Sequence, residues 1–282
     1  MFFASVFCGL LVLVAPGEAQ HALIQAEEKV FIDWSAGTVR AKGIAMPASA
    51  GNELPMGSPE DTQNTARKLA ESNLLVTLDA IRIDADAHVA DRVKRNTAFR
   101  DGLAALARNV PVTHQAYLSD GTVEVELTMN FVGGFNQYVL PEEIRQVDSV
   151  TTVNSAGRQH KNQGDAFTGL IIDATGIGAM PSLVPVVVDE KEEVVYGPEF
   201  VSREFAVSRG MIGFSTTLAL ARDEKRVGNR PLVIRSIRTR RTGGVDLVIS
   251  STDAAKLRSS VQHLDFLKQC RVCIVIDQYP EE

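Results

Sequence analysis

The sequence predicts an α+β fold with two two-layer domains, each an antiparallel sheet covered by helices. Alternating polar and apolar residues occur in pairs of runs around short turns, which indicates β-hairpins. Segments with apolar residues at helical spacing lie between these pairs. Residues 145–165 separate two such blocks, and their Ser, Thr, Asn, Gln and Gly content is typical of a linker. The predicted domains are therefore residues 20–144 and residues 166–282.

The N-terminal residues predict a signal peptide over residues 1–19. Residues 2–15 form an uninterrupted apolar run, Pro16 ends it, and the small residues Gly17 and Ala19 follow. The run is shorter than the roughly 20 apolar residues that a transmembrane helix needs. Because no Lys or Arg precedes it, a buried N-terminal helix or strand remains the alternative. We expect export through a cleaved signal peptide, and no later stretch is long enough to span a bilayer.

The first block begins with a predicted hairpin of residues 29–34 and 38–45. A helix is then predicted from Ser58, because Ser at the N-cap, Pro at the first helical position and an acidic residue in the first turn mark a helix start. Apolar residues at helical spacing continue this helix to Ile81. A second, shorter helix is predicted over residues 99–109.

Residues 110–132 predict a second hairpin, turning at Asp120 and Gly121. After the turn, apolar residues alternate with Glu, Thr and Asn from Val123 to Phe131. Strict alternation predicts an antiparallel sheet with one face in water and the other covered by helices.

The second block also mixes strands with helices. The expected elements, in chain order, are a strand at 169–174, a hairpin of 183–188 with 194–196, partly helical residues 201–223, a hairpin of 232–239 with 245–250, a helix from 251 through 264, and a strand at 271–277.

Asp84, Asp86 and His88 are the candidate metal ligands. On a strand these alternating residues would share one face and could bind a hard cation or zinc. The Gly and terminal Glu of a calcium loop have no counterpart here. The favoured interpretation is a solvated edge, because charged edge strands guard against unwanted pairing.

Two short motifs suggest chemistry that their context does not support. Gly176 and Gly178 follow a strand as in a dinucleotide-binding loop, but the third glycine is missing and the next segment predicts a strand instead of a helix. Cys270 and Cys273 form C-x-x-C on a predicted strand, where residues three apart face opposite sides. We therefore predict a glycine turn and two buried thiols, with neither a disulfide nor a metal site.

No catalytic signature occurs, and the five His residues are scattered. The sequence therefore predicts no enzyme activity, no catalytic residues and no cofactor. A net charge of −6 argues against nucleic-acid binding. The basic residues Arg235, Arg238, Arg240 and Arg241 predict a solvated hairpin tip, with an acidic partner or lipid headgroup as the alternative.

Three segments of the first block resemble a known family. Residues 40–45 (RAKGIA), 66–74 (ARKLAESNL) and 117–129 (YLSDGTVEVELTM) are similar to the small bacterial outer-membrane lipoprotein family, which includes the flagellar basal-disc protein FlgP and relatives of the flagellar H-ring protein FlgT. The resemblance implies a non-enzymatic envelope protein that assembles with copies of itself or with a surface structure. It supplies no catalytic residues, and this chain lacks the lipobox Cys, so the resemblance does not imply a lipid anchor.

The sequence therefore favours an exported, non-catalytic envelope protein, located in the periplasm or at the outer membrane. It would form a homo-oligomer or bind an envelope partner, with flagellar association as one possibility. The first alternative is a periplasmic small-ligand or metal-binding module built on Asp84, Asp86 and His88 or on the Gly176–Gly178 loop. The second is an enzyme of unrecognised type, which would show a pocket with convergent polar groups.

Overall fold

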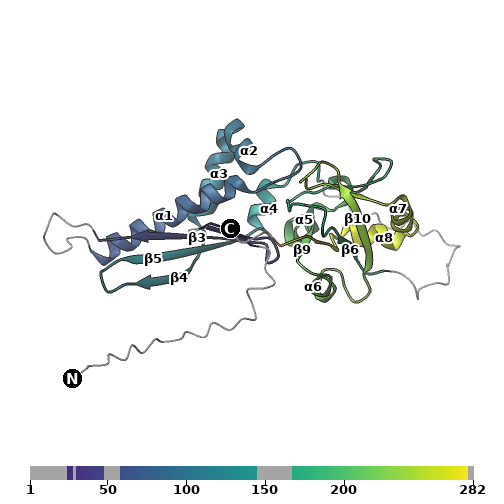
Figure 1. Cartoon of the computed structure of the whole chain (residues 1–282). Coiled ribbons are helices and arrows are strands. Elements are labelled where there is room, and N and C mark those ends of the chain that lie inside the picture. The colour runs from purple at the N-terminus through teal and green to yellow at the C-terminus, as the bar shows by residue number, and fades with distance from the viewer. Residues whose placement is uncertain (1–23, 28–29, 48–57, 145–166, 279–282) are drawn as a thin grey trace, which may run out of the picture.

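The computed structural model describes residues 24–27, 30–47, 58–144 and 167–278. Two β-sheets with helices packed on them confirm the predicted α+β class (Figure 1). The predicted signal peptide, residues 1–19, and the predicted linker, residues 145–165, lie outside the described residues. Within the described part of the chain, no helix has the length and apolar character needed to cross a bilayer.

The first sheet is antiparallel throughout and has the strand order β1-β2-β3-β5-β4. Both predicted hairpins form, as β2–β3 and as β4–β5. Gly37 and Gly121 occupy their turns with positive φ angles of 65° and 84°, which glycine adopts without steric cost. The strands are β1 (Ile24–Glu27), β2 (Val30–Asp33), β3 (Thr38–Ala45), β4 (Val112–Tyr117) and β5 (Val123–Asn130).

Helix α1 (Pro59–Ala80) covers one face of this sheet (Figure 1). As predicted, Ser58 caps it, because its hydroxyl accepts the backbone N–H of Asp61 at 3.1 Å. The helix lies so close to β3 that a Cβ on Gly43 would be 2.0 Å from the carbonyl oxygen of Ala66. The glycine is therefore what permits this helix-to-sheet distance.

The alternation predicted for β5 is confirmed. Its apolar residues from Val123 to Met129 are buried under α1, while the intervening Glu124, Glu126 and Thr128 are half-buried on the opposite face. On that opposite face, Lys42 pairs with Glu124 at 2.5 Å. The first sheet thus has one apolar face and one polar face.

Three further helices, α2 (Val89–Arg95), α3 (Thr97–Arg108) and α4 (Gly134–Val139), complete this half. Helix α3 corresponds to the second predicted helix and starts at Asn96, whose side chain accepts the N–H of Phe99. The ring of Phe99 stacks on Tyr138 of α4 with centroids 4.9 Å apart. Neither α2 nor α4 was predicted.

The second sheet has the strand order β8-β7-β11-β10-β6-β12-β9. The prediction of a fully antiparallel sheet is wrong here. The pairs β10–β6, β6–β12, β12–β9 and β11–β7 are parallel, whereas the hairpins β7–β8 and β10–β11 are antiparallel. The strands are β6 (Leu170–Asp173), β7 (Val187–Asp189), β8 (Val194–Tyr196), β9 (Gly213–Ser215), β10 (Leu232–Thr239), β11 (Leu247–Ile249) and β12 (Val272–Val275).

Burial on both faces explains these parallel pairs. Leu170 and Ile172 of β6 join the main core, while Ile171 packs against Ala221 on the other side of the sheet. Strands covered on both faces by crossover helices pair in parallel and carry continuous apolar runs. The helices are α5 (Arg203–Arg209), α6 (Leu218–Asp223), α7 (Ser251–Arg258) and α8 (Val261–Lys268), the last two replacing the one helix predicted from 251 through 264.

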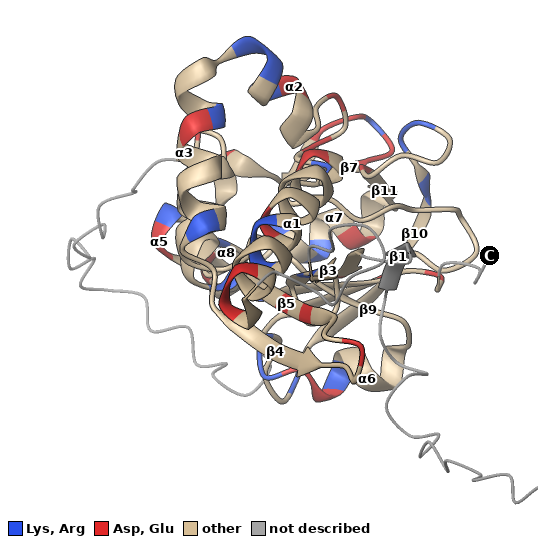
Figure 2. Ribbon diagram, turned by 90° about the vertical axis from the view of Figure 1, so that its left-hand side faces the viewer, with Lys and Arg blue, Asp and Glu red and all other residues tan. Residues whose placement is uncertain are grey.

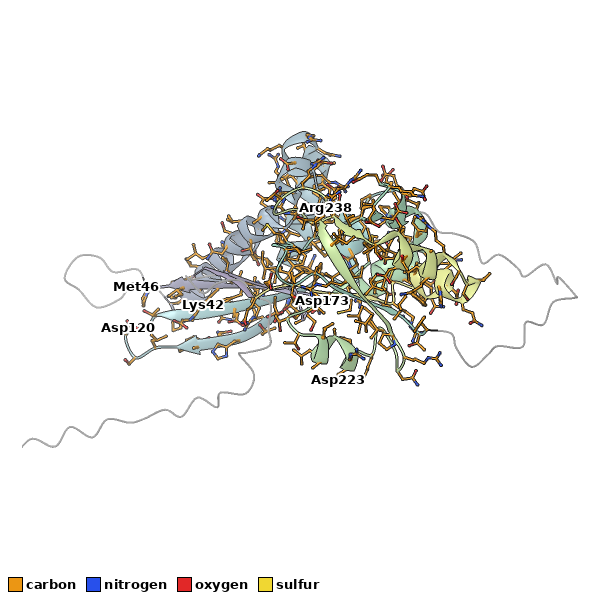
Figure 3. The ribbon with its side chains drawn as sticks, turned by 45° about the vertical axis from the view of Figure 1, so that its right-hand side comes forward. Lys42, Met46, Asp120, Asp173, Asp223 and Arg238 are labelled. Atoms are coloured by element: carbon orange, nitrogen blue, oxygen red, sulfur yellow. The ribbon has the colours of Figure 1, made fainter. Side chains whose placement is uncertain are left out.

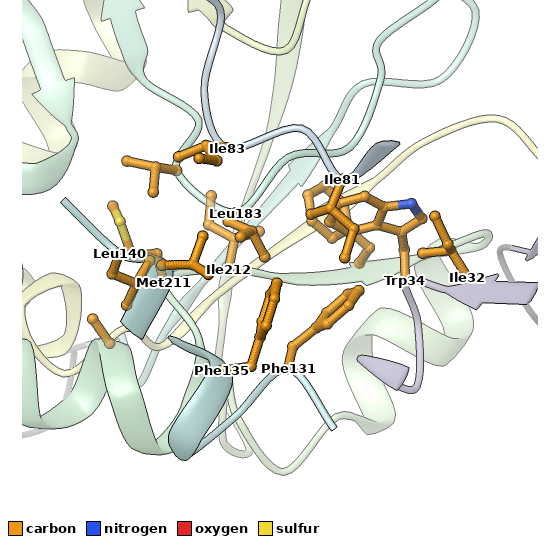
Figure 4. Packing of buried hydrophobic residues seen from close by; sticks show 14 of the residues in the cluster. Ile32, Trp34, Ile81, Ile83, Phe131, Phe135, Leu140, Leu183, Met211 and Ile212 are labelled. Atoms are coloured by element: carbon orange, nitrogen blue, oxygen red, sulfur yellow. The ribbon is translucent and has the colours of Figure 1, made fainter. Parts of the chain in front are cut away.

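The two sheets share one hydrophobic core (Figure 4). The ring of Trp34, in the β2–β3 turn, lies 5.2 Å from Phe131 and 5.8 Å edge-on from Phe214 of the second sheet. Backbone hydrogen bonds also join the halves, because the N–H groups of Leu183 and Val184 donate to residues 82 and 83 at 3.0 and 2.8 Å. The sheets are therefore packed together as one body.

Candidate functional site

The structure does not place Asp84, Asp86 and His88 on one strand face, so that prediction is wrong. The Asp84 carboxylate accepts the backbone N–H groups of Asp86 and Ala87, both at 2.9 Å, and this closes a turn. Asp86 pairs with Arg241 at 2.5 Å, and His88 is the N-cap of α2. In the part of the chain that the structure describes, no group of three or more His, Cys, Asp or Glu side chains could hold a metal ion.

The glycine loop after β6 is a turn, as predicted. Gly176 and Gly178 have positive φ angles, and no helix starts there. The N–H of Gly176 donates to the Asp277 carboxylate at 2.8 Å. A carboxylate of the chain itself thus occupies the position that a bound phosphate would need.

Both thiols are buried, as predicted, but only Cys273 lies on β12; the prediction that both are on this strand is wrong, because Cys270 is in the preceding turn with a φ angle of 57°. Cys270 belongs to the main core, whereas Cys273 packs with Ala221 on the other side of the sheet. Burial raises the pKa of Cys270 to about 11 and the pKa of Cys273 to about 12. Neither thiol is therefore an activated nucleophile at neutral pH.

The arginines of the β10–β11 hairpin are exposed and paired within the chain. Arg238 and Arg240 contact Glu192 at 3.5 and 2.6 Å, and Arg241 contacts Asp86 of the first half. Figure 3 labels Arg238 on β10, which lies inside the second sheet between β11 and β6. One arginine of the cluster thus links the two halves of the molecule.

The far end of the first sheet gathers exposed apolar side chains, and we call this group the distal tip. It consists of Ile44, Met46, Tyr117 and Leu118, with exposed fractions of 40%, 75%, 61% and 44%. The register pairs Ala45 with Val123 and Val123 with Tyr117, so Tyr117 lies in this cross-strand row on the α1 face, where its hydroxyl donates to Gln63. Ile44, Met46 and Leu118 adjoin the same row. Figure 3 shows Met46 beside the Asp120 turn at this end.

Strand β4 leads into the distal tip and forms one edge of the first sheet. Its sequence, VTHQAY, contains no Asp, Glu, Lys or Arg, and residues 113–115 are polar and mostly exposed. Natural sheets usually protect such edges with charges, prolines or bulges. Here a bulge between Val112 and His114 is the protective feature, and among the described strands β4 pairs with β5 alone.

Residues of both halves line a cavity of about 90 Å³ at the junction of the sheets. Trp34 and Asn136 come from the first half, and Ser182, Arg209 and Arg226 come from the second. These residues lie on five separate segments, so sequence reasoning missed the group. The sequence signal that could have raised it is Trp34, the one tryptophan of the chain, next to a turn.

Charged side chains of both signs are distributed over the helices and loops of both halves (Figure 2). The distal tip and the junction cavity are therefore local features on a surface of mixed charge. The fold and these two features define an α+β protein with an exposed apolar end and an inter-sheet cavity.

Residues 169–278 match the family described as the second domain of Treponema pallidum Tp0624. The match spans every strand of the second sheet and none of the first. No curated protein matches the chain. The second half is thus similar to a unit that is recognised as a domain in another protein.

Proposed function

We propose that this protein is an exported, non-catalytic cell-envelope protein that assembles with copies of itself or with an envelope structure. The observation that carries the proposal is the distal tip, where four large apolar side chains are exposed at one end of the first sheet, two of them at the end of the edge strand β4. Grouped exposed apolar residues mark interaction sites in soluble domains. The predicted signal peptide and the resemblance of residues 20–144 to the outer-membrane lipoprotein family support export and assembly.

The occupant that best fits this surface is a second copy of the chain. Two β4 strands pairing antiparallel across a two-fold axis would extend the five-stranded sheet into a ten-stranded one. The absence of charged residues from β4 means that no like charges would meet at the axis. Tyr117, at the end of β4, and Leu118, directly after it, would be covered by the second copy.

The location that we propose is the periplasm or the outer membrane, and a flagellar structure is one candidate partner that the family resemblance suggests. Expression of the full chain, followed by cell fractionation and N-terminal sequencing, tests this location. We expect a mature protein that begins at Gln20 in an envelope or periplasmic fraction. Full-length protein in the cytoplasm would contradict the proposal.

Analytical ultracentrifugation over a wide concentration range tests self-assembly. The double variant Tyr117→Lys with Leu118→Lys should raise the dissociation constant at least tenfold, because about 1.5–3 kcal/mol is lost for each large apolar side chain that no longer becomes buried. The matched control is Val76→Lys with Val261→Lys, which changes two apolar residues that are 67% and 83% exposed outside the distal tip. This control should assemble like the parent chain.

The result that would overturn the proposal is a protein that is monomeric at all concentrations and does not associate with any envelope fraction. A monomer that binds the envelope through the same two residues would support the envelope partner over the second copy.

A further inference from the structure

The junction cavity contains an arginine whose charge no carboxylate contacts among the described residues. Arg226 donates from Nη1 to the carbonyl oxygens of Gly210 and Cys270 at 2.9 and 3.1 Å, and from Nη2 to that of Arg209. Glu224 attracts the guanidinium from beyond ion-pair distance. Burial lowers the pKa of Arg226, which shows that its charge is held in a poorly hydrated place.

Three other residues that line the cavity hold a buried polar atom without a hydrogen-bond partner in the structure. They are Nε1 of Trp34, Oδ1 of Asn136 and Oγ of Ser182, in side chains that are at most 5% exposed. Buried polar groups are normally hydrogen-bonded, and an unmade bond costs about 1–3 kcal/mol. Each atom has less than 1 Å² of accessible surface, so a polar molecule in the cavity would bond to it only after the side chain turns toward the cavity.

The chemistry of these groups defines what the molecule must offer. The indole N–H of Trp34 needs an acceptor, the Asn136 carbonyl needs a donor, and the Ser182 hydroxyl can use either. Arg226 and the exposed Arg209, which lies at 5.1 Å over the Phe205 ring, favour an anion. A carboxylate matches guanidinium groups by geometry as well as by charge.

The cavity of about 90 Å³ has room for several water molecules only, so the molecule must be short. We propose that the junction cavity binds a short hydroxycarboxylate, its carboxylate toward Arg209 and Arg226 and its hydroxyl toward Asn136 and Ser182. This site is separate from the distal tip and does not depend on the proposed assembly. It uses none of the metal-ligand candidates or loop glycines that the sequence suggested.

Trp34 provides a direct reporter, because it lines the cavity and is the one tryptophan of the chain. The fluorescence of the full chain would be titrated at constant ionic strength with glycolate, with propionate, which has the same shape without the hydroxyl, and with inorganic phosphate. We expect a saturable change with glycolate and at least tenfold weaker binding of propionate, because propionate leaves the Asn136 carbonyl unpaired.

Ser182→Ala and Arg209→Gln should each weaken glycolate binding at least tenfold. The matched controls are Ser236→Ala, which removes a buried hydroxyl that donates to the Val248 carbonyl at 3.0 Å, and Arg100→Gln on exposed α3. Both controls should bind glycolate like the parent chain.

Three results would overturn the proposal. The first is a fluorescence signal that none of the probes changes in a saturable way. The second is tighter binding of phosphate than of glycolate. The third is a melting temperature that rises in Ser182→Ala while glycolate leaves both proteins unaffected, since removing an unpaired buried hydroxyl stabilises a site that has no ligand.

Discussion

The two sheets of this molecule differ in strand direction and in how many of their faces are buried. The first sheet is antiparallel, and α1 covers one of its faces, so β5 alternates between buried apolar residues and half-buried polar residues. The second sheet is largely parallel, and β6 and β12 are buried on both faces. What covers a sheet thus determines both the direction of its strands and the pattern of its sequence.

The largest expected effect is on the free energy of unfolding, and alanine substitutions in β6 and β5 compare the two sheets. In β6, Ile171→Ala and Ile172→Ala should each lower the free energy of unfolding by about 2–5 kcal/mol, because each side chain is fully buried on its own face. In β5, Glu126→Ala should change it by no more than about 0.5 kcal/mol. Denaturant unfolding measures both, and similar losses at Ile171 and Glu126 would contradict the comparison.

Gly43→Ala should have the next largest effect and should act on the first sheet. A Cβ there would be 2.0 Å from the Ala66 carbonyl oxygen and 2.3 Å from the Ala70 nitrogen, so α1 must move away from the sheet. We expect a loss of about 3 kcal/mol, the upper end of the usual range for overpacking. The matched control is Gly176→Ala in an open turn with φ of 76°, where strain alone should cost about 1–2 kcal/mol. Equal losses of stability in Gly43→Ala and Gly176→Ala would show that α1 can move away from the sheet without an added cost.

Alkaline pH should weaken the second sheet through its buried thiols. The pKa of Cys273 rises from its ordinary value of 9.0 to about 12 in the folded chain, so unfolding releases a proton above pH 9. Stability should be unaffected by this thiol below pH 9 and should fall between pH 9 and 12 by about 1.4 kcal/mol per pH unit. Cys273→Ala should reduce that slope in unfolding curves at pH 8, 9 and 10. An unchanged slope would mean that the thiol is not buried as the structure shows.

The smallest expected effect concerns the ion pair that joins the halves at their surface. Arg241 and Asp86 are both exposed, so Arg241→Ala should alter stability slightly, and the difference should vanish in high salt. Thermal unfolding at low and high ionic strength measures this. A loss that persists at 1 M salt would mean that Arg241 contributes by packing.

The sequence was informative where a local rule determined the structure. The Ser58 cap, the Gly37 and Gly121 turns and the alternation of β5 each depend on residues a few positions apart. The direction of β6 depends instead on partners about 60 and 100 residues away, in β10 and β12. Its continuous apolar run was consistent with a strand buried on both faces, but hairpins elsewhere in the second block favoured an antiparallel sheet.

The candidate sites also differ in whether residues close in sequence determine their structure. Asp84, Asp86 and His88 seemed to form a strand face, but the Asp84 side chain bonds to the next backbone groups and bends the chain. The burial of both cysteines was predictable from the apolar residues around them, but the turn that places Cys270 before β12 was not. The junction cavity was not predictable, because Trp34 and Ser182 meet through the packing of the two sheets.

Because the two halves share one core, their association does not require an unbroken chain between them. Trp34 packs against Phe131 of its own half and against Phe214 across the junction, and backbone hydrogen bonds link residues 82–83 to 183–184. These contacts hold the halves together independently of residues 145–165. A chain cut within that stretch should therefore behave as a split protein, whose two co-expressed fragments reassociate and purify as one complex.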